Sequence, residues 1–153
     1  MCLIADIGGT NARFALVEDG GRAPQHERTL PCANYHTLVD AVLAYLEDVS
    51  QPMPEAASLA IATPVLKDRV VMTNHVWDLS VAETRKSLGL KSLKVINDYT
   101  ALALALPYLG DNDYRKVGGG ESVEKQTRAV LGPGTGLGVS GSIYTGEFWY
   151  PIQ

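Results

Sequence analysis

The sequence contains no cluster of four or more basic residues, and its 13 Lys and Arg are outnumbered by 17 Asp and Glu, for a net charge of −4. This balance argues against the broad positive surface that nucleic-acid-binding proteins present. An anionic ligand would have to be held by local dipoles and backbone N–H groups. We therefore expect no nucleic-acid partner.

Cysteine is scarce, with Cys2 and Cys32 as the two in the chain. Two cysteines are too few for a disulfide framework, and the absence of C-x-x-C spacing and of histidine partners argues against a zinc site. We expect two buried thiols in a reducing cytosol. The segment before Asp6 lacks a basic region and has only a short apolar run, so it predicts neither a signal peptide nor a membrane span. A cytoplasmic protein is expected.

Glycine is the residue type in excess, with 15 in 153 residues, about 10% against a usual ~7%. A hydrophobic share of 46% excludes disorder, and 15 Gly with 8 Pro exclude a long coiled coil. Length alone suggests one globular domain. The positions of the glycines therefore decide which segments are candidate sites.

The hydrophobic pattern predicts short strands and helices in alternation. Helices are expected from Leu38 to Val49, after a capping Ser80 with Gly89 as the residue that follows the helix end, and over Tyr99–Leu106. Strands are expected at Cys2–Ile7, Ala12–Glu18, His26–Leu30, Ala57–Ala62, Arg69–Met72, Leu93–Ile96, Arg128–Leu131, Val139–Tyr144 and Glu147–Tyr150. This order predicts a mixed α/β sheet that begins as an antiparallel meander and adds parallel strands.

The first glycine pair, Gly8-Gly9, lies between two predicted strands and is followed by Thr10 and Asn11. Such a turn can fold tightly and direct successive N–H groups at an anion, while the two polar side chains add donors. Asp6, at the end of the first strand, can hold a hydrated Mg²⁺ that bridges phosphate oxygens. The ordinary alternative is a hairpin turn in which Gly-Gly supplies positive φ.

A second glycine-rich loop, Gly132–Gly138, also lies between predicted strands and would let a polyphosphate approach the main chain. It is not a P-loop, because no Gly-Lys-[Ser/Thr] follows. The residues from Gly136 to Gly141 fit G-x-G-x-x-G by spacing, but β-branched and aromatic residues follow where a dinucleotide site needs a helix. We reject the dinucleotide interpretation.

The pair Asn97-Asp98 stands where a strand ends and a helix begins. A helix N-terminus favours the negative charge of a carboxylate. Asp98 could then accept a proton from a hydroxyl that attacks a phosphoryl group, while Asn97 orients that hydroxyl. The ordinary alternative is a helix N-cap.

These motifs together resemble the bacterial glucokinase family of the hexokinase and actin-like ATPase superfamily. Four segments carry the resemblance in the family's order, at Ala5–Arg13, Met72–Trp77, Ile96–Ala101 and Gly132–Gly138. The resemblance implies an α/β fold of the ribonuclease H-like (actin-like ATPase) type. In that fold a mixed sheet flanked by helices is followed by the first strands of a second α/β domain.

The resemblance also implies an enzyme of glycolysis, a glucokinase that phosphorylates the 6-hydroxyl of glucose with ATP. Asp98 would be the general base, and Asn97 and Asp98 would bind the sugar. Nucleotide phosphate would be bound by Asp6, Ile7, Gly8, Gly9, Thr10, Asn11, Gly134, Thr135 and Gly136. Asp6 would hold Mg²⁺ through water. The resemblance gives glucose and ATP as partners, no membrane, and allows a homodimer, although nothing in these residues specifies its interface.

The sequence departs from the family pattern in two respects. Tyr99 stands where the family often has Phe, which would place a hydroxyl near the sugar site. Family members are also roughly twice as long, beyond a typical domain of ~100–150 residues, and their sugar-binding Glu-Gly-Gly-His segment is absent here. We expect residues 1–109 to form a small α/β domain with the first phosphate motif and the catalytic Asp, and residues 110–153 to begin a truncated large domain.

Two interpretations of the short chain remain open. It is either an incomplete fragment of a glucokinase, with negligible turnover alone, or a natural short module that binds sugar or nucleotide without catalysis. A third class, an actin-like ATPase without a sugar substrate, is disfavoured by Asn97-Asp98. Within these segments, His75 and Trp77 are interpreted as turn structure and core filling, and Arg13 as a surface or salt-bridge residue.

Overall fold

The computed structural model of the chain describes residues 1–72, 77–133 and 137–152. The chain forms two compact units, Met1–Asp98 and Tyr99–Gln153. The expected domain boundary between residues 109 and 110 stays a prediction. Within the described residues, no helix is both long enough and apolar enough to span a membrane.

The first unit contains a five-stranded mixed sheet with the strand order β3-β2-β1-β4-β7. Its strands are β1 (Cys2–Ile7), β2 (Asn11–Val17), β3 (Gln25–Pro31), β4 (Ala56–Ile61) and β7 (Ser92–Asn97). β1, β2 and β3 form an antiparallel meander, whereas β4 and β7 are added parallel to β1. The predicted mixed sheet is confirmed.

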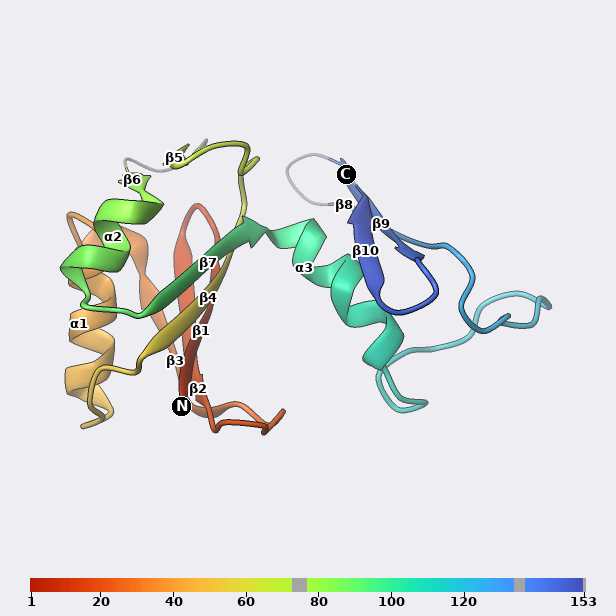
Figure 1. Cartoon of the computed structure of the whole chain (residues 1–153), viewed down its shortest axis with the longest axis horizontal. Coiled ribbons are helices and arrows are strands. Elements are labelled where there is room, and N and C mark those ends of the chain that lie inside the picture. The colour runs from red at the N-terminus through yellow and green to blue at the C-terminus, as the bar shows by residue number, and fades with distance from the viewer. Residues whose placement is uncertain (73–76, 134–136, 153) are drawn as a thin grey trace. The chain divides into compact units, whose positions relative to one another are not determined.

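Helices α1 (Leu38–Asp48) and α2 (Val81–Ser87) cover one face of this sheet (Figure 1). α1 begins at a capping box, in which the Thr37 hydroxyl accepts from the Asp40 N–H and the Asp40 carboxylate accepts from the Thr37 N–H. α2 begins after Ser80, whose side chain accepts from the N–H of Glu83, and is followed by Gly89 with a φ of 64°. The predicted start and end signals of α2 are confirmed.

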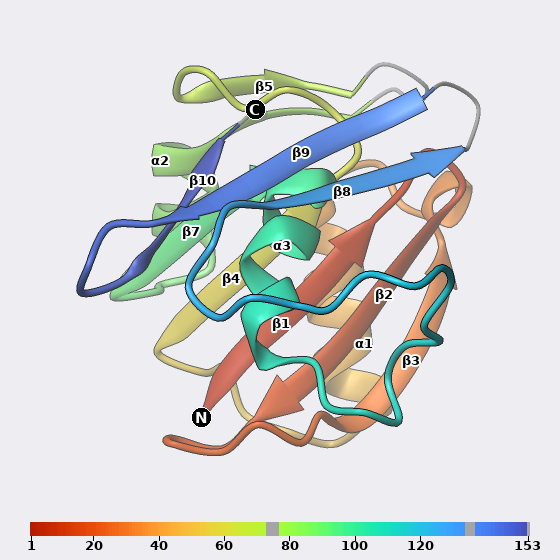
Figure 2. The ribbon, with the colours of Figure 1, turned by 90° about the vertical axis from the view of Figure 1, so that its right-hand side faces the viewer.

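The hydrophobic core belongs to the first unit, because every member of the buried cluster lies between Leu3 and Leu90. Alternate residues of β1 and β4 are buried, because successive side chains of a strand point to opposite faces of the sheet. Phe14 and Tyr45 stack with ring centroids 5.2 Å apart and join β2 to α1. Figure 2 shows α1 behind the meander.

A two-stranded ribbon of β5 (Arg69–Val71) and β6 (Asp78–Ser80) lies outside the main sheet. β6 was not expected from the sequence, since only one of its three residues, Leu79, is buried. A strand this short has no period that a pattern can reveal. The expected strand at Arg69–Met72 is one residue shorter.

The second unit contains α3 (Asp98–Ala105, its first residue assigned to the first unit) and an antiparallel meander of β8 (Arg128–Pro133), β9 (Leu137–Tyr144) and β10 (Trp149–Ile152). Pro107 ends the α-helix as expected and lies in a short 3₁₀ turn, Leu106–Tyr108. The last strand lies two residues later than expected. Another 3₁₀ turn, Cys32–Asn34, follows β3.

The two cysteines are free thiols, but they differ in burial. Cys32 is fully buried, as expected, whereas Cys2 is only half-buried. The expectation of two buried thiols is therefore wrong for Cys2, whose side chain alternates with Leu3 to the less covered face of β1.

Candidate functional site

The first glycine turn and the Asn97-Asp98 pair meet at one edge of the five-stranded sheet. β1, β4 and β7 are parallel neighbours, and their last residues, Ile7, Ile61 and Asn97, stand opposite one another in the register. The turn follows β1 and Asp98 follows β7, so two strand spacings, about 10 Å, separate the two strand ends. Ligands of α/β sheets bind outside such carboxyl ends.

The first glycine turn is closed by a hydrogen bond of its own and is also hydrogen-bonded to Cys32. The N–H of Gly8 donates to the carbonyl of Asn11 at 2.9 Å and closes the hairpin. The N–H of Cys32 donates to the Thr10 carbonyl at 2.8 Å, and its thiol donates to the Gly8 carbonyl at 3.6 Å. Within the described part of the chain, the N–H groups of Gly9 and Thr10 have no hydrogen-bond partner. These two donors can therefore serve an anion.

The hairpin itself does not explain the glycine at position 8. Positive φ occurs at four of the described glycines, at positions 20, 89, 118 and 146, and neither Gly8 nor Gly9 is among them. A Cβ added to Gly8 would lie 3.5 Å from the Asn11 carbonyl oxygen, an ordinary contact. The alternative in which Gly-Gly supplies positive φ is wrong.

Asp6 forms an ion pair with Arg13 across the β1–β2 ladder. Arg13 Nη1 lies 3.2 Å from Asp6 Oδ2, and the side chains are 68% and 56% exposed. The interpretation of Arg13 as a salt-bridge residue is confirmed. Among the described residues there is no group of three or more His, Cys, Asp and Glu that could hold a metal ion. The donor set at Asp6 is one exposed carboxylate, which fits a magnesium ion that keeps most of its water.

Asn97 fixes the carboxylate that follows it. Its Nδ2 donates to Asp98 Oδ1 at 2.8 Å and makes longer contacts of 3.4 Å and 3.3 Å with the carbonyls of Ile61 and Thr63. Asp98 is the first residue of α3. The amide therefore ties Asp98 to the end of β4.

The backbone after β4 was missed as part of the site by sequence reasoning. Thr63 is buried, and its hydroxyl donates to the Val71 carbonyl at 3.1 Å. This hydrogen bond fixes the position of Thr63, whose own carbonyl faces Asn97. The sequence signal was present in the polar Thr63 directly after the apolar strand Ala57–Ala62. Its meaning depends on β4 lying between β1 and β7.

The second glycine-rich loop lies in a hairpin, as expected. Gly132 pairs with Gly138, and Pro133 with Leu137, across β8 and β9. A strand, not a helix, follows the loop, as the β-branched and aromatic residues predicted. The predicted phosphate ligands Gly134, Thr135 and Gly136 lie outside the described residues.

The mid-domain segment is described in part. Trp77 is buried, and its Nε1 donates to the Tyr35 carbonyl at 3.0 Å, which confirms its interpretation as a core residue. Asn74 and His75 lie outside the described residues.

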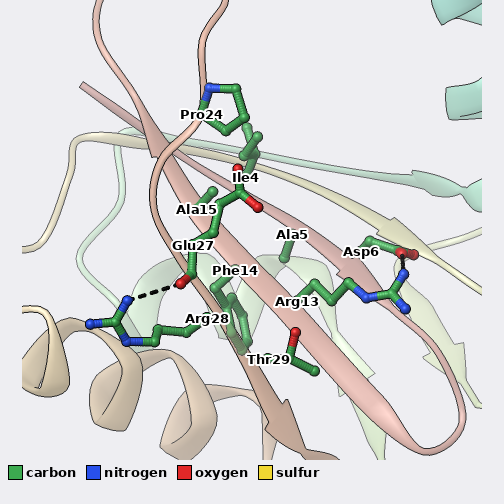
Figure 3. A pocket seen from close by; sticks show the side chains of 10 residues that line it. All are labelled: Ile4, Ala5, Asp6, Arg13, Phe14, Ala15, Pro24, Glu27, Arg28 and Thr29. Carbon is green, nitrogen blue, oxygen red and sulfur yellow. Dashed lines mark hydrogen bonds and ion pairs between the residues drawn. The ribbon is translucent and has the colours of Figure 1, made fainter. Parts of the chain in front are cut away.

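A hollow of about 520 Å³ lies on the sheet face of β1, β2 and β3 (Figure 3). Ile4, Ala15 and Thr29 contribute to its floor, and the Asp6–Arg13 ion pair lies at one end. Its lining includes neither the turn Gly8–Asn11 nor Asn97 and Asp98. The hollow therefore shares Asp6 with the candidate site but does not include the glycine turn or the Asn97-Asp98 pair.

Comparisons with known proteins find that this chain is similar to glucokinases. The Glucokinase family model matches residues 3–153. The glucokinase of Chromohalobacter salexigens is 47% identical over 150 residues, which are 98% of this chain and 47% of that protein. The glucokinase of Neisseria meningitidis serogroup B is 49% identical over 150 residues, 98% of this chain and 45% of that protein. The chain spans about half the length of the curated relatives it matches.

Solved structures give the same result for the fold. The crystal structure of glucokinase from an Antarctic psychrotroph matches with a TM-score of 0.89 and 36% identity, over 99% of this chain and 49% of that one. A glucokinase from Balamuthia mandrillaris in complex with glucose shares the fold, with a TM-score of 0.65 and 20% identity, over 98% of this chain and 46% of that one. The predicted fold class is confirmed, and the chain belongs to the glucokinase family.

Proposed function

We propose that this chain forms the N-terminal half of a cytoplasmic glycolytic glucokinase, which transfers the γ-phosphoryl group of ATP to the 6-hydroxyl of glucose. The observation that carries the proposal is the register of β1, β4 and β7, which places Asp98 and the first glycine turn at one sheet edge. The curated relatives from Chromohalobacter and Neisseria bear the name glucokinase.

The role proposed for Asp98 is that of the general base. Its carboxylate accepts the proton of the 6-hydroxyl as that oxygen attacks the γ-phosphorus, and ADP leaves with the electron pair of the broken P–O bond. Asn97 Nδ2 donates to Asp98 Oδ1 at 2.8 Å and thereby orients the carboxylate. Asn97 keeps this orientation and, as the resemblance implies, also binds the sugar.

The nucleotide phosphates are assigned to the two glycine turns. In the first, the N–H groups of Gly9 and Thr10 are the donors without a partner in the described chain, and Asp6, Ile7, Gly8 and Asn11 complete the segment. In the second, Gly134, Thr135 and Gly136 are proposed. Asp6 would hold Mg²⁺ through water after release from Arg13, and the ion would neutralise charge on the phosphates.

The substitution Asp98→Asn in the full-length enzyme tests the base. Asparagine can still accept from Asn97 through its Oδ1 but cannot take a proton, so kcat should fall by about 10²–10⁴. ATP binding, measured by nucleotide titration, should stay within about threefold. Asp111→Asn, an exposed carboxylate in the second unit, is the matched control. An Asp98→Asn enzyme with unchanged kcat would overturn the assignment.

Glucose-6-phosphate formation by the 153-residue chain alone tests the alternative of a self-sufficient short protein. We expect negligible turnover, because the chain spans about half the length of enzymes of this family. Robust product formation would contradict the proposal that it is one half of the enzyme. Glucose or nucleotide binding by the full-length protein without turnover would favour the non-catalytic module, and ATP hydrolysis unaffected by glucose would favour the actin-like ATPase.

A further inference from the structure

Tyr99, the residue after Asp98, contacts both strands that flank the second glycine-rich loop. Its hydroxyl donates to the Gly132 carbonyl at 2.7 Å. Atoms of its side chain occupy the space where a Cβ would stand on Gly132 or Gly138, at separations below 3.0 Å, which real Cβ atoms essentially never show. All three residues belong to the same compact unit.

The contact explains why glycine stands at both positions. Gly132 and Gly138 are directly opposite in the β8–β9 register, and neither has positive φ. Their backbone conformations therefore allow other residues, and the ring of Tyr99 is what excludes a side chain. Because neither glycine of this cross-strand pair has a side chain, the ring packs directly on the backbone.

The 3₁₀ turn that follows α3 is attached independently. Arg128 Nη1 donates to the Leu106 carbonyl at 2.8 Å, and its guanidinium lies 4.8 Å from the centre of the Trp149 ring. Loss of the Tyr99 side chain therefore leaves the helix joined to the meander. A Tyr99 variant should change the local position of the hairpin without unfolding the unit.

We propose that Tyr99 is a positioning residue, which holds the strand ends Gly132–Pro133 and Leu137–Gly138 against the helix that begins with Asp98. The inference rests on the proposed function, because α3 carries the general base and the hairpin presents the second phosphate loop. The Tyr99 hydroxyl is bound to the hairpin backbone, and its expected place near the sugar stays a prediction. Tyr99 thus acts on nucleotide binding through the hairpin.

Steady-state kinetics of Tyr99→Ala and Tyr99→Phe in the full-length enzyme test this role. Tyr99→Ala should raise the KM for ATP by about 10- to 100-fold, the size expected for misplacement of about 1 Å, and leave the KM for glucose within about threefold. Tyr99→Phe keeps the ring and should recover most of the ATP affinity. Equal rises in both KM values, or no rise in either, would overturn the proposal.

A double-mutant cycle with Gly138→Ala separates packing of the ring from general damage. Gly138→Ala alone should raise the KM for ATP, because the new methyl displaces the ring. In the Tyr99→Ala background the same change should add little, since the space is then empty. Gly119→Ala, at a glycine with nothing within 4 Å of its Cβ position, is the control. Additive effects in the cycle would contradict the contact.

Thermal unfolding is measured for the parent enzyme, Tyr99→Ala, Gly138→Ala and the double variant. This measurement keeps the test of the contact separate from the glucokinase assignment. If the contact exists, Gly138→Ala should lower the melting temperature more in the Tyr99 background than in the Tyr99→Ala background. Non-additive melting temperatures without glucose phosphorylation would retain the contact and reject the glucokinase assignment. Additive melting temperatures in an active glucokinase would reject the positioning role alone.

Discussion

The buried phenol of Tyr45 shows how single side chains join the elements of the first unit. Tyr45 is fully buried, and its hydroxyl donates to the His26 carbonyl at 3.0 Å. Tyr45→Phe leaves that carbonyl without this donor and should lower the free energy of unfolding by about 1 kcal/mol. Urea denaturation measures the change. Tyr150→Phe, on an exposed ring, should stay within about 0.5 kcal/mol of the parent.

The thiol of Cys32 and the phenol of Tyr45 predict how stability changes with pH. Burial raises the pKa of both groups in the folded chain. The neutral forms are therefore favoured by folding, and their contribution is complete below the unfolded pKa values, about 8.5 for Cys and about 10 for Tyr. The free energy of unfolding should fall as pH rises through and above this range.

Urea titrations between pH 7 and pH 11 would measure this fall. Cys32→Ala should reduce the part that begins near pH 8.5, to which Cys2 also contributes because burial raises its pKa, whereas Tyr45→Phe should remove the part that begins near pH 10. Stability that rises with pH over the interval would contradict the assigned directions.

Because Cys2 is partly exposed and Cys32 is not, iodoacetamide should also modify Cys2 first.

Among the elements, α1 is the helix whose start is most strongly specified. The capping box of Thr37 and Asp40 satisfies donors at the first turn from both sides. Thr37→Ala should lower the free energy of unfolding by about 1 kcal/mol. Thr37→Ser retains the hydroxyl and should recover most of it, as measured by chemical denaturation. Equal losses in the two variants would show that the methyl group, and not the cap, matters.

The elements that the sequence predicted well are those with a clear period or a specific terminus. β1 has the bounds Cys2–Ile7 that its apolar run and the glycine pair predict, and Ser80 and Gly89 bound α2 as expected. β6 was missed because three residues with one buried side chain have no measurable period. α3 begins at Asp98, one residue before the expected start at Tyr99, because β7 and α3 join without a linker.

At the scale of the whole molecule, the two units differ in how much apolar surface they bury. The core cluster lies entirely within Leu3–Leu90, whereas the second unit exposes several large apolar side chains of β8 and β9, Leu131, Leu137, Val139 and Ile143 among them. Residues 1–109 should therefore fold alone with a cooperative thermal transition and a buried Trp77. Circular dichroism and tryptophan fluorescence of this segment would check it.

Residues 99–153, the second compact unit, provide a second experiment. The exposed face of β8 and β9 leaves this segment without the burial that independent stability requires. It should show no cooperative transition and should bind a hydrophobic dye. A sharp thermal transition for this segment, or none for residues 1–109, would contradict the assignment of the core to the first unit.

The sequence by itself determined the chemistry of the candidate site: a carboxylate at a helix start, an amide before it, and two glycine turns in hairpins. It could not determine that β4 lies between β1 and β7, because pairing between strands far apart in the chain depends on which faces are buried together. Tertiary structure alone aligned Ile7, Ile61 and Asn97 and thereby brought the first turn and Asp98 to one edge. It also placed Tyr99 over Gly132 and Gly138, since close packing selects glycine wherever a ring must lie on backbone.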